Sequence, residues 1–367
     1  MNLLQLIGRS EALFEHDIAR HDRLLSEMVS SSRFLVIGGA GSIGQAVTRE
    51  IFKRKPKVLH VVDISENNMV ELVRDVRSTL GYIDGDFSTF AIDCGAPHFD
   101  ALMKWSGGYD YVLNLSALKH VRSEKDPFTL MRMVDVNVLN TNKTIDLAKE
   151  YGAHKYFCVS TDKAASPINL YGATKLLSDK LFVAANNTVG KQATRYAVVR
   201  YGNVVGSRGS VVPLFQKLVA DGVTELPITD PRMTRFWITL QEGVDFVLRA
   251  FERMYGGELF VPKIPSARIT DLAEALGPGL PQRMIGIRPG EKLHEMMISR
   301  DDSLHTLEFQ DHYVITPSIR FVEGSDFASN GRGEQGSPVT EGFKYVSDSN
   351  PQFLSVEEIR ALSEQKA

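Results

Sequence analysis

The chain of 367 residues contains only two cysteines, Cys94 and Cys158. Two cysteines cannot build a disulfide scaffold, which excludes a small disulfide-stabilised secreted fold and favours a reducing compartment such as the cytoplasm. The chain also lacks an apolar run of the ~20 residues that a membrane-spanning helix requires. Its first residues include Glu11, Glu15 and Asp17 and form no unbroken apolar stretch, which argues against a signal peptide. We therefore expect a cytoplasmic protein with no membrane partner.

Positive charge is not in excess. The chain has 42 Lys and Arg residues against 45 Asp and Glu, a formal net charge of -3, which excludes the basic footprint of a dedicated nucleic-acid-binding protein. Hydrophobic residues make up 43% and charged residues 24% of the sequence, as in ordinary globular chains. We find no internal repeat, and we predict no bound metal.

From Arg33 onward, short apolar runs alternate with helical patterns. Strands separated by helices indicate βαβ units and a parallel sheet covered by helices on both faces. The predicted fold class is α/β, a Rossmann-like doubly wound parallel sheet with a smaller C-terminal substrate-binding lobe. The predicted strands are 34–38, 57–63, 88–93, 109–115, 155–160 and 195–203.

The alternation breaks after about residue 210. Residues 224–238 and 286–293 are rich in Pro, Arg and Asp and are interpreted as loops lining a cleft, and 323–350 as a polar surface excursion. Ser355 followed by Glu358 forms a capping box that predicts a last short helix. We predict an N-terminal helical extension, a mainly dinucleotide-binding domain, a mainly substrate-binding lobe interleaved with the sheet, and a C-terminal excursion with a helix: 1–30, 31–205, 206–322 and 323–367.

The N-terminal extension carries apolar residues at close to helical spacing, with charged residues between them. This pattern predicts a helical appendage that packs on the body of the protein or on another subunit. A membrane-surface helix is disfavoured, because the polar side mixes both signs of charge instead of being basic.

A glycine-rich segment directly follows the first predicted strand and opens a helix. Gly38 permits a tight turn, Gly41 lets backbone approach a pyrophosphate, and Gly44 allows close contact between helix and strand. The helix N-terminus also offers oriented N–H groups to phosphates. The alternative is a structural glycine turn without a ligand. The predicted dinucleotide-binding residues of this segment are Gly38, Gly41, Ser42, Ile43 and Gly44.

Two acidic residues extend the predicted cofactor site. Asp63 ends the second predicted strand, 19 residues after Gly44, where a carboxylate accepts hydrogen bonds from the adenosine ribose hydroxyls. Asp93 ends the third predicted strand and is placed to meet the adenine edge. A carboxylate at Asp63 would repel a 2′-phosphate, and no Arg or Lys follows it before Arg74. The sequence therefore favours NAD, with NADP as the alternative.

Tyr171 and Lys175 are four residues apart, so on a helix their side chains share one face. The Lys175 ammonium can lower the pKa of the Tyr171 phenol and bind the nicotinamide ribose, while the phenolate takes a proton from a substrate hydroxyl. An ordinary amphipathic helix face is the alternative. It is disfavoured because the pair follows a strand ending in Ser160 and Thr161, in a chain that already has the glycine segment.

Thr161, Asp162 and Lys163 follow the fifth predicted strand and reach the carboxyl edge of the sheet, where open α/β proteins bind ligands. An adjacent carboxyl and amine could serve as general acid and general base, and a loop ion pair is the alternative. Lys163 can act as a base only if its pKa is depressed, which we expect from desolvation in a closed cleft.

These residues lie within longer segments that resemble the soluble, 5-inverting UDP-N-acetylglucosamine 4,6-dehydratases, extended short-chain dehydrogenase/reductases of the polysaccharide biosynthesis protein type. The resemblance runs from about residue 33 to 320 and is most specific at 160–187. Simpler sugar epimerases lack the Asp-Lys pair, and dTDP-glucose-type dehydratases carry Asp-Glu there. The matching segments are NLSALKHV (114–121), STDKAASPINLYGATKLLSDKLFVAANN (160–187), VVRYGNVVGSRGSVVP (198–213), PITDPRMTRFWIT (227–239), ELFVPKIPS (258–266) and GIRPGEKLHE (286–295).

The resemblance implies a three-step cycle on a UDP-N-acetylhexosamine with a tightly bound, recycled NAD. Tyr171, assisted by Lys175 and Thr161, would remove the C4 hydroxyl proton as hydride leaves. Lys163 would remove the C5 proton, Asp162 would protonate the departing C6 hydroxyl, and hydride would return to C6 with inversion at C5. The product would be a 4-keto-6-deoxy sugar nucleotide for bacterial surface sugars of the pseudaminic acid type.

The resemblance also implies a homo-oligomer, a dimer or a hexamer, and residues that hold the nucleotide sugar. Arginines suit a diphosphate because their fork of donors binds phosphate oxygens bidentately. Lys119 would point at the cofactor or the substrate. The implied substrate-binding residues are Asn203, Arg208, Thr229, Arg235 and Arg288.

Two alternatives stay open at this point. The first is a retaining 4,6-dehydratase or an epimerase on a related nucleotide sugar, which product stereochemistry would distinguish. The second is a non-catalytic nucleotide-binding protein. The combined presence of Thr161, Asp162, Lys163, Tyr171 and Lys175 disfavours the second, since a protein without turnover has no need for all five.

Overall fold

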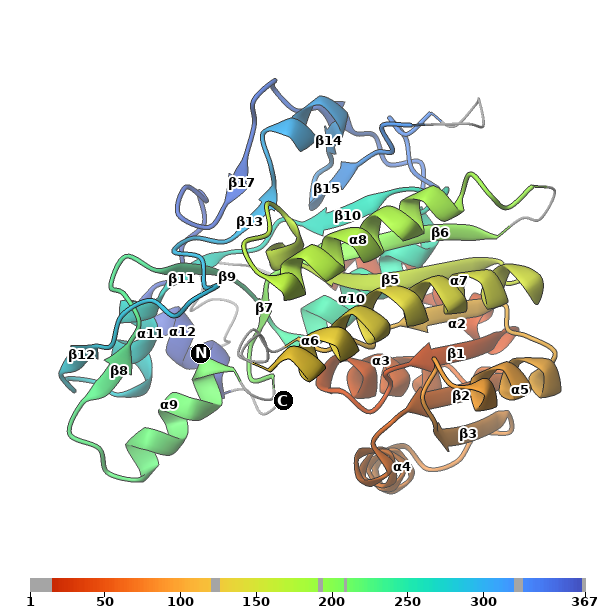
Figure 1. Cartoon of the computed structure of the whole chain (residues 1–367), viewed down its shortest axis with the longest axis horizontal. Coiled ribbons are helices and arrows are strands. Elements are labelled where there is room, and N and C mark those ends of the chain that lie inside the picture. Colours follow the sequence, from red (N-terminus) through yellow and green to blue (C-terminus); the bar gives the residue numbers. More distant parts are fainter. Residues whose placement is uncertain (1–14, 120–125, 191–193, 208–209, 320–325, 365–367) are drawn as a thin grey trace.

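Helices lie on both faces of one large sheet (Figure 1). The computed structural model describes residues 15–119, 126–190, 194–207, 210–319 and 326–364. In its N-terminal half, buried apolar runs form the strands and amphipathic segments form the helices between them. The elements of this half are α2 (Glu15–Ser30), β1 (Arg33–Ile37), α3 (Ser42–Lys53), β2 (Val58–Asp63), α4 (Glu66–Leu80), β3 (Asp86–Ala91), α5 (Pro97–Ser106), β4 (Tyr111–Asn114), α6 (Pro127–Val134), the π-helical turn η2 (Asp135–Leu139), α7 (Asn140–Glu150), β5 (Lys155–Thr161), the short helix η3 (Asp162–Ala164), α8 (Leu170–Ala185) and β6 (Arg195–Tyr201).

The C-terminal half alternates less regularly and has several strands of only two or three residues. Its elements are β7 (Asn203–Val204), α9 (Val211–Ala220), β8 (Leu226–Ile228), β9 (Thr234–Ile238), α10 (Leu240–Arg253), β10 (Leu259–Pro262), β11 (Ser266–Arg268), α11 (Ile269–Leu276), β12 (Gln282–Met284), β13 (Met296–Ile298), η4 (Asp301–His305), β14 (Thr306–Glu308), β15 (His312–Ile315), β16 (Ser337–Pro338), β17 (Tyr345–Val346) and α12 (Val356–Glu364).

The strand order of the large sheet confirms the doubly wound α/β class. Within the described residues the order is β16-β14-β15-β10-β6-β5-β4-β1-β2-β3. The strands from β3 to β10 pair in parallel, and β15, β14 and β16 add antiparallel. Helices α6, α7 and α8 cover one face, and α2, α3 and α10 the other (Figure 1). The order reverses between β1 and β4, and ligands of such folds bind at this reversal, outside the carboxyl ends of the strands.

One predicted strand is displaced along the chain. The third strand spans Asp86–Ala91 instead of 88–93, because β3 pairs residue for residue with β2 from Val58↔Asp86 to Asp63↔Ala91. Asp93 therefore lies in the turn after the strand, where its Oδ1 accepts a hydrogen bond from the Gly95 N–H at 2.8 Å.

A second, smaller hydrophobic cluster lies apart from the large sheet. It joins α9, α11 and the strands β8 and β9 with the C-terminal helix α12, and its fully buried members include Leu226 and Ile359. The capping box predicted for α12 is present, since the Glu358 N–H donates to Ser355 Oγ and the Ser355 N–H donates to Glu358 Oε2. The exact domain boundaries stay a prediction.

The interpretation of residues 224–238 as a loop is wrong. This segment contains β8, which pairs with β12, and β9, which lies between β11 and β7. Its polar centre is only a turn, in which Asp230 accepts hydrogen bonds from Arg232, while the apolar flanks are buried as strands. The neighbouring Pro and Asp residues interrupt the apolar pattern of these two short strands, so the sequence carries no clear strand signal.

The interpretation of 323–350 as a surface excursion is also incorrect for its last part. β17 pairs antiparallel with β13, and Tyr345, Ser347 and Asn350 are buried. The Tyr345 hydroxyl accepts from the Ile264 N–H at 2.9 Å and donates to the Ile264 carbonyl at 2.8 Å. Long-range pairing of this kind leaves no periodic signal in a short polar segment.

The described part of the N-terminal extension is a helix that packs on the body of the protein, one of the two placements that the sequence left open. α2 lies beside α10, and Leu25 and Val29 are buried in the main hydrophobic cluster. An ion pair between Asp22 Oδ1 and Arg54 Nη2, at 2.8 Å, joins α2 to the end of α3. Residues 1–14 lie outside the described residues. Among the helices that are described, none is long and apolar enough to cross a membrane.

The adjacent leucines of α2 provide a matched test of this packing. Leu25 is 6% exposed and Leu24 is 60% exposed. We expect Leu25→Ala to lower the free energy of unfolding by about 2–5 kcal/mol, because it leaves a cavity under the helix. Leu24→Ala should change it by less than about 0.5 kcal/mol. Equal effects in urea unfolding would contradict the packing of α2 on the body.

Candidate active site

The glycine segment forms the predicted tight turn at the carboxyl end of β1. Gly38 has a positive φ of 76° and lies so close to the end of β4 that an added Cβ would be 2.5 Å from the Ser116 nitrogen. A Cβ on Gly44 would be 2.2 Å from the Gly38 carbonyl oxygen. Gly41 is the N-cap residue of α3 and gives no side-chain cap. The glycines at 38 and 44 are thus required by the close approach of backbone to backbone.

The carboxylate of Asp63 closes this turn from the end of β2. Its Oδ2 accepts from the Ala40 N–H at 3.0 Å, and its Oδ1 accepts from the Ser65 N–H at 2.9 Å. Asp93 lies farther along the same edge and accepts from the Asn140 side chain at 3.2 Å.

The glycine segment and Asp63 fit a dinucleotide. The segment brings backbone N–H groups and the start of α3, with Ser42 and Ile43 in its first turn, to the switch point between β1 and β4. A helix N-terminus favours phosphate, and a carboxylate at the end of β2 suits ribose hydroxyls.

Tyr171 and Lys175 share the buried face of α8, as their spacing predicts. They are 8% and 3% exposed. The Asn169 side chain caps α8 by accepting from the Gly172 N–H at 2.7 Å. A Cβ on Gly172 would be 2.2 Å from the Lys163 carbonyl oxygen, so the first turn of α8 packs directly on the backbone of Lys163. This contact brings Tyr171 beside the Asp-Lys pair.

The expected lowering of the Tyr171 pKa is not the net result. Burial raises the pKa of Tyr171, and the nearby Lys175 and Lys163 ammonium groups oppose that rise only in part. For Lys175, burial favours the neutral amine, but Cys158, Tyr171 and Asp179 outweigh it and raise the pKa. The Lys175 Nζ donates to the Val159 carbonyl at 2.9 Å, which fixes the side chain against β5.

Asp162 and Lys163 form an ion pair at the carboxyl end of β5. Asp162 is fully buried, and its Oδ1 lies 3.0 Å from Lys163 Nζ. The same oxygen accepts from the Thr161 hydroxyl at 2.8 Å. Lys163 Nζ also donates to Asn203 Oδ1 at 3.3 Å. The structure therefore brings Thr161, Asp162, Lys163 and Asn203 together, four residues that the sequence singled out.

The expected depression of the Lys163 pKa is contradicted. Burial acts in the expected direction, but the Asp162 and Glu295 carboxylates outweigh it and raise the pKa of Lys163 above its ordinary value. Burial alone favours the neutral amine, whereas the two carboxylates stabilise the ammonium. In this state of the site Lys163 holds its proton.

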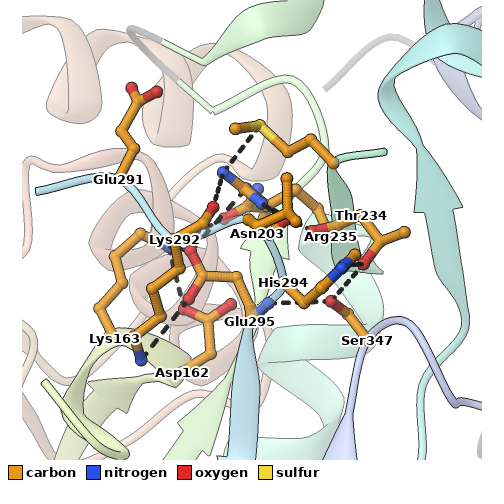
Figure 2. A network of polar contacts seen from close by, with 12 residues as sticks. Asp162, Lys163, Asn203, Thr234, Arg235, Glu291, Lys292, His294, Glu295 and Ser347 are labelled. Carbon is orange, nitrogen blue, oxygen red and sulfur yellow. Dashed lines mark hydrogen bonds and ion pairs between the residues drawn. The ribbon is translucent and has the colours of Figure 1, made fainter. Parts of the chain in front are cut away.

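Glu295 is a site residue that the sequence did not single out (Figure 2). It is 2% exposed, and its Oε1 lies 3.5 Å from Lys163 Nζ and 3.8 Å from Arg235 Nε. Lys292 Nζ lies 4.0 Å from its other carboxylate oxygen. The only signal in the sequence was an acidic residue directly before the apolar run of β13, within the quoted segment 286–295.

Arg235 donates hydrogen bonds to backbone carbonyl groups, so not all of its N–H donors are available to bind a diphosphate. It donates to the carbonyls of Thr234 (2.7 Å), Lys292 (3.0 Å) and Leu293 (3.1 Å). Lys292 in turn donates to the Ala165 carbonyl at 2.6 Å. Arg235 therefore fastens the segment before Glu295 to β9 (Figure 2).

Ser347, in the C-terminal excursion, fixes the backbone of Glu295 on its other side. The Glu295 N–H donates to Ser347 Oγ at 2.9 Å, and the Ser347 N–H donates to the Glu295 carbonyl at 2.8 Å. Ser347 Oγ also lies 2.7 Å from Thr234 Oγ1. The last 45 residues of the chain thus help to build the site, a role that their polar composition did not indicate.

The other predicted substrate residues are not all part of this cluster. Thr229 follows β8 and is half-buried, and Arg288 lies between β12 and β13 in an ion pair with Glu291 at 3.1 Å. Glu291 points away from the cluster (Figure 2). Lys119 is exposed at the end of the segment after β4, and Arg208 lies outside the described residues.

Asn137 is another residue that the sequence analysis missed. It lies in the π-helical turn η2 and is 1% exposed. Its Oδ1 accepts from the Leu118 N–H at 2.9 Å, and its Nδ2 donates to the Leu118 carbonyl at 3.0 Å and to Thr174 Oγ1 at 3.1 Å. Asn137 thereby ties the segment that carries Lys119 to α8. A π-helical turn within a helix is frequent at functional sites.

The carboxyl edge of the sheet carries a dinucleotide-type turn after β1 and a buried Asp-Lys pair after β5, which a Tyr-Lys helix adjoins. A family model described as "Polysaccharide biosynthesis protein" matches residues 34–317. The chain belongs to this family.

Two further comparisons identify similar proteins. The chain is 48% identical to the UDP-N-acetylglucosamine 4,6-dehydratase (inverting) of Campylobacter jejuni, over 90% of this chain and 97% of that protein. The solved structure of Pen from Bacillus thuringiensis has a TM-score of 0.78 and 31% identity, and the match covers 91% of this chain and 97% of that one.

A more distant structure shares the fold. DesIV, a dTDP-glucose 4,6-dehydratase from Streptomyces venezuelae solved with NAD bound, has a TM-score of 0.59 and 22% identity, over 71% of this chain and 86% of that one. At this identity the likeness supports the fold alone.

The support that Ser347 gives to Glu295 can be tested by stability. Ser347→Ala leaves the buried Glu295 N–H without its acceptor, and we expect it to lower the free energy of unfolding by about 1–3 kcal/mol. Ser337→Ala, at an exposed position of β16, should change it by less than about 0.5 kcal/mol. Urea unfolding of both variants measures the difference, and equal midpoints would show that Ser347 does not hold this segment.

Proposed function

We propose that the protein is a UDP-N-acetylglucosamine 4,6-dehydratase that uses tightly bound NAD, recycles it in each turnover, and inverts C5 of the sugar. The observation that carries the proposal is the position of the Asp162–Lys163 ion pair directly beside Tyr171 on α8. The 48% identity to the inverting dehydratase of Campylobacter jejuni supports it. Cytoplasmic location and homo-oligomeric assembly stay predictions from the sequence.

The glycine turn and its neighbours would hold the dinucleotide. Gly38, Gly41, Ser42, Ile43 and Gly44 would surround the pyrophosphate, as their place at the start of α3 suggests. Asp63 and Asp93 would meet the adenosine, while Lys119, Tyr171 and Lys175 would lie toward the nicotinamide end. The choice of NAD over NADP rests on the Asp63 carboxylate, which would repel a 2′-phosphate. The chemistry that NAD supplies when bound is hydride transfer, first from C4 and later to C6 of the sugar.

The proton count of the site suits a dehydration. Transfer of one proton from the Lys163 ammonium to the Asp162 carboxylate, 3.0 Å away, gives a neutral amine and a carboxylic acid without any exchange with solvent. The amine then takes the C5 proton, and the acid gives its proton to the departing C6 hydroxyl, which leaves as water. The elimination restores the original ion pair. A raised resting pKa for Lys163 is therefore compatible with a role as base.

Tyr171 and Thr161 would act at the C4 hydroxyl. Only a phenolate can accept a proton, so the Tyr171 phenol must first lose its own proton to solvent. The phenolate, stabilised by Lys175, would then accept the C4 hydroxyl proton. Substrate contacts are proposed for Asn203, Arg208, Thr229, Arg235 and Arg288. Because Arg235 already donates to backbone carbonyls, its contribution would be mainly to place the loop that precedes Glu295.

The first prediction from this proposal concerns the product. The purified protein, incubated with UDP-N-acetylglucosamine in deuterium oxide without added cofactor, should form a 4-keto-6-deoxy sugar nucleotide with deuterium at C5. NMR identifies the product, and its coupling constants separate inversion from retention. A 4-epimer that keeps its C6 hydroxyl would show an epimerase instead. No reaction, in protein shown to contain NAD, would contradict the proposal for this substrate.

The second prediction concerns Lys163. Lys163→Ala should lower the dehydration rate by about 10²- to 10⁴-fold, the usual contribution of a general base, while the protein keeps its bound NAD. Lys104→Ala, at an exposed lysine of α5, serves as the matched control and should keep full activity. Wild-type turnover by Lys163→Ala would remove Lys163 from the role of base.

A further inference from the structure

We propose that Glu295 is a positioning residue for Lys163, which together with Asn203 holds the Lys163 amine in line with Asp162 so that one proton passes between these two. This inference rests on the proposed dehydratase function and deepens it. It concerns the acid-base half of the site, where the C5 proton and the C6 hydroxyl leave.

The Lys163 ammonium has three N–H donors and three oxygen partners from three separate segments. Asp162 Oδ1 at the end of β5 is 3.0 Å from Nζ, Asn203 Oδ1 at the start of β7 is 3.3 Å, and Glu295 Oε1 before β13 is 3.5 Å. A lysine ammonium has no acceptor capacity and three donors. Two of these oxygens accept hydrogen bonds from Nζ, and the Glu295 carboxylate faces it as an ion pair. The ammonium is thereby held beside Asp162, and the proton on that side is the one that can transfer.

Glu295 is built to stay in place. Its backbone N–H and carbonyl both bond to Ser347, and the residues on either side are held by arginines. Arg235 donates to the carbonyls of Lys292 and Leu293. Arg200, itself paired with Asp179 at 2.9 Å, donates to the Met297 carbonyl at 2.9 Å. A carboxylate on such a braced segment can define the position of a flexible lysine side chain.

The charges around Lys163 make the effect of Glu295 distinct from that of a neutral acceptor. The groups that face Lys163 are two carboxylates and three other polar or charged side chains: Asp162, Glu295, Arg235, Lys292 and Tyr171. Arg235 and burial favour the neutral amine, while the two carboxylates favour the ammonium. Removal of one carboxylate disfavours the state in which the Asp162–Lys163 pair holds two protons, so the pair reaches its active one-proton state at a lower pH.

The test follows two rates in the same single-turnover reaction with UDP-N-acetylglucosamine in deuterium oxide. Reduction of the bound NAD reports oxidation at C4, and deuterium incorporation reports proton removal at C5. For Glu295→Gln we expect C5 exchange at its pH plateau to fall about 10- to 100-fold, while oxidation at C4 keeps its wild-type rate. The limb of C5 exchange that rises with pH should move to lower pH by about one unit or more. Glu295→Asp, which keeps the charge, should leave this limb near its wild-type position.

Glu258→Gln is the matched control. Glu258 is also a buried glutamate, 3% exposed, but it accepts hydrogen bonds from the Tyr255 and Gly256 N–H groups before β10. Burial raises the pKa of Glu258 to about 7. The amide would lose one of these two hydrogen bonds, which lowers stability without touching the site. This variant should keep both rates and the pH profile. Thermal unfolding of all variants verifies that each is folded.

Each outcome decides the proposal. A loss of C5 exchange with unchanged C4 oxidation and a shifted limb supports it. An unchanged pH limb in folded Glu295→Gln, or an equal loss of both rates, overturns it, because a merely structural residue would act in that way. A wild-type protein that forms no 4-keto product would overturn the proposed function itself and this inference with it. That failure is visible in the wild-type reaction alone.

Discussion

The buried carboxylate of Asp162 needs a cation beside it, and much of the site is arranged around that need. Asp162 is fully buried at the end of β5, and Lys163 supplies the opposite charge from the next residue. A single lysine so close to the end of a strand has several rotamers, so other groups must select one. Asn203 and Glu295 do so, and Glu295 in turn is compensated by Arg235 and Lys292. The result is a chain of alternating charges, which is the arrangement that makes buried ions tolerable.

This chain of charges joins parts of the sequence that lie far apart. β5 belongs to the large parallel sheet, Arg235 to β9 of the smaller lobe, and Ser347 to the segment after β17. The small lobe and the C-terminal segment can therefore act on the chemistry through Glu295, in addition to any contact that their side chains make with the substrate. Variation in the C-terminal segment can alter the reaction through this route as well as through substrate contacts.

The parts of the site that the sequence predicted are those with local rules. The glycine turn needs close backbone approach at Gly38 and Gly44, and the Tyr171–Lys175 pair needs only the helical repeat. Glu295, Ser347 and Asn137 act through partners 19 to 132 residues away along the chain, so no local pattern indicates them. The short strands β8 and β9 were missed for the same reason: their pairing partners lie in β12, β11 and β7, and a turn at Asp230 interrupts their apolar pattern.

Burial and nearby charges oppose each other at Lys163 and at Tyr171, so neither pKa has the net direction that burial alone (for Lys163) or its neighbour alone (for Tyr171) would give. Burial does act to lower the pKa of Lys163, and Lys175 does act to lower that of Tyr171, yet both pKa values are raised on balance. Burial disfavours charge on either group, so it lowers the pKa of an amine and raises the pKa of a phenol. For Lys163 the two carboxylates outweigh burial and raise the pKa. For Tyr171 the two ammonium groups oppose burial but do not outweigh it, so the pKa stays raised. Both groups therefore rest in their protonated forms. The Asp162–Lys163 pair becomes competent by moving a proton within the site, whereas Tyr171 has to lose its proton before it can act as a base. Such a site depends on the geometry that joins Lys163 to Asp162 more than on the resting pKa of either group, which is why a braced carboxylate at Glu295 has a physical reason to be there.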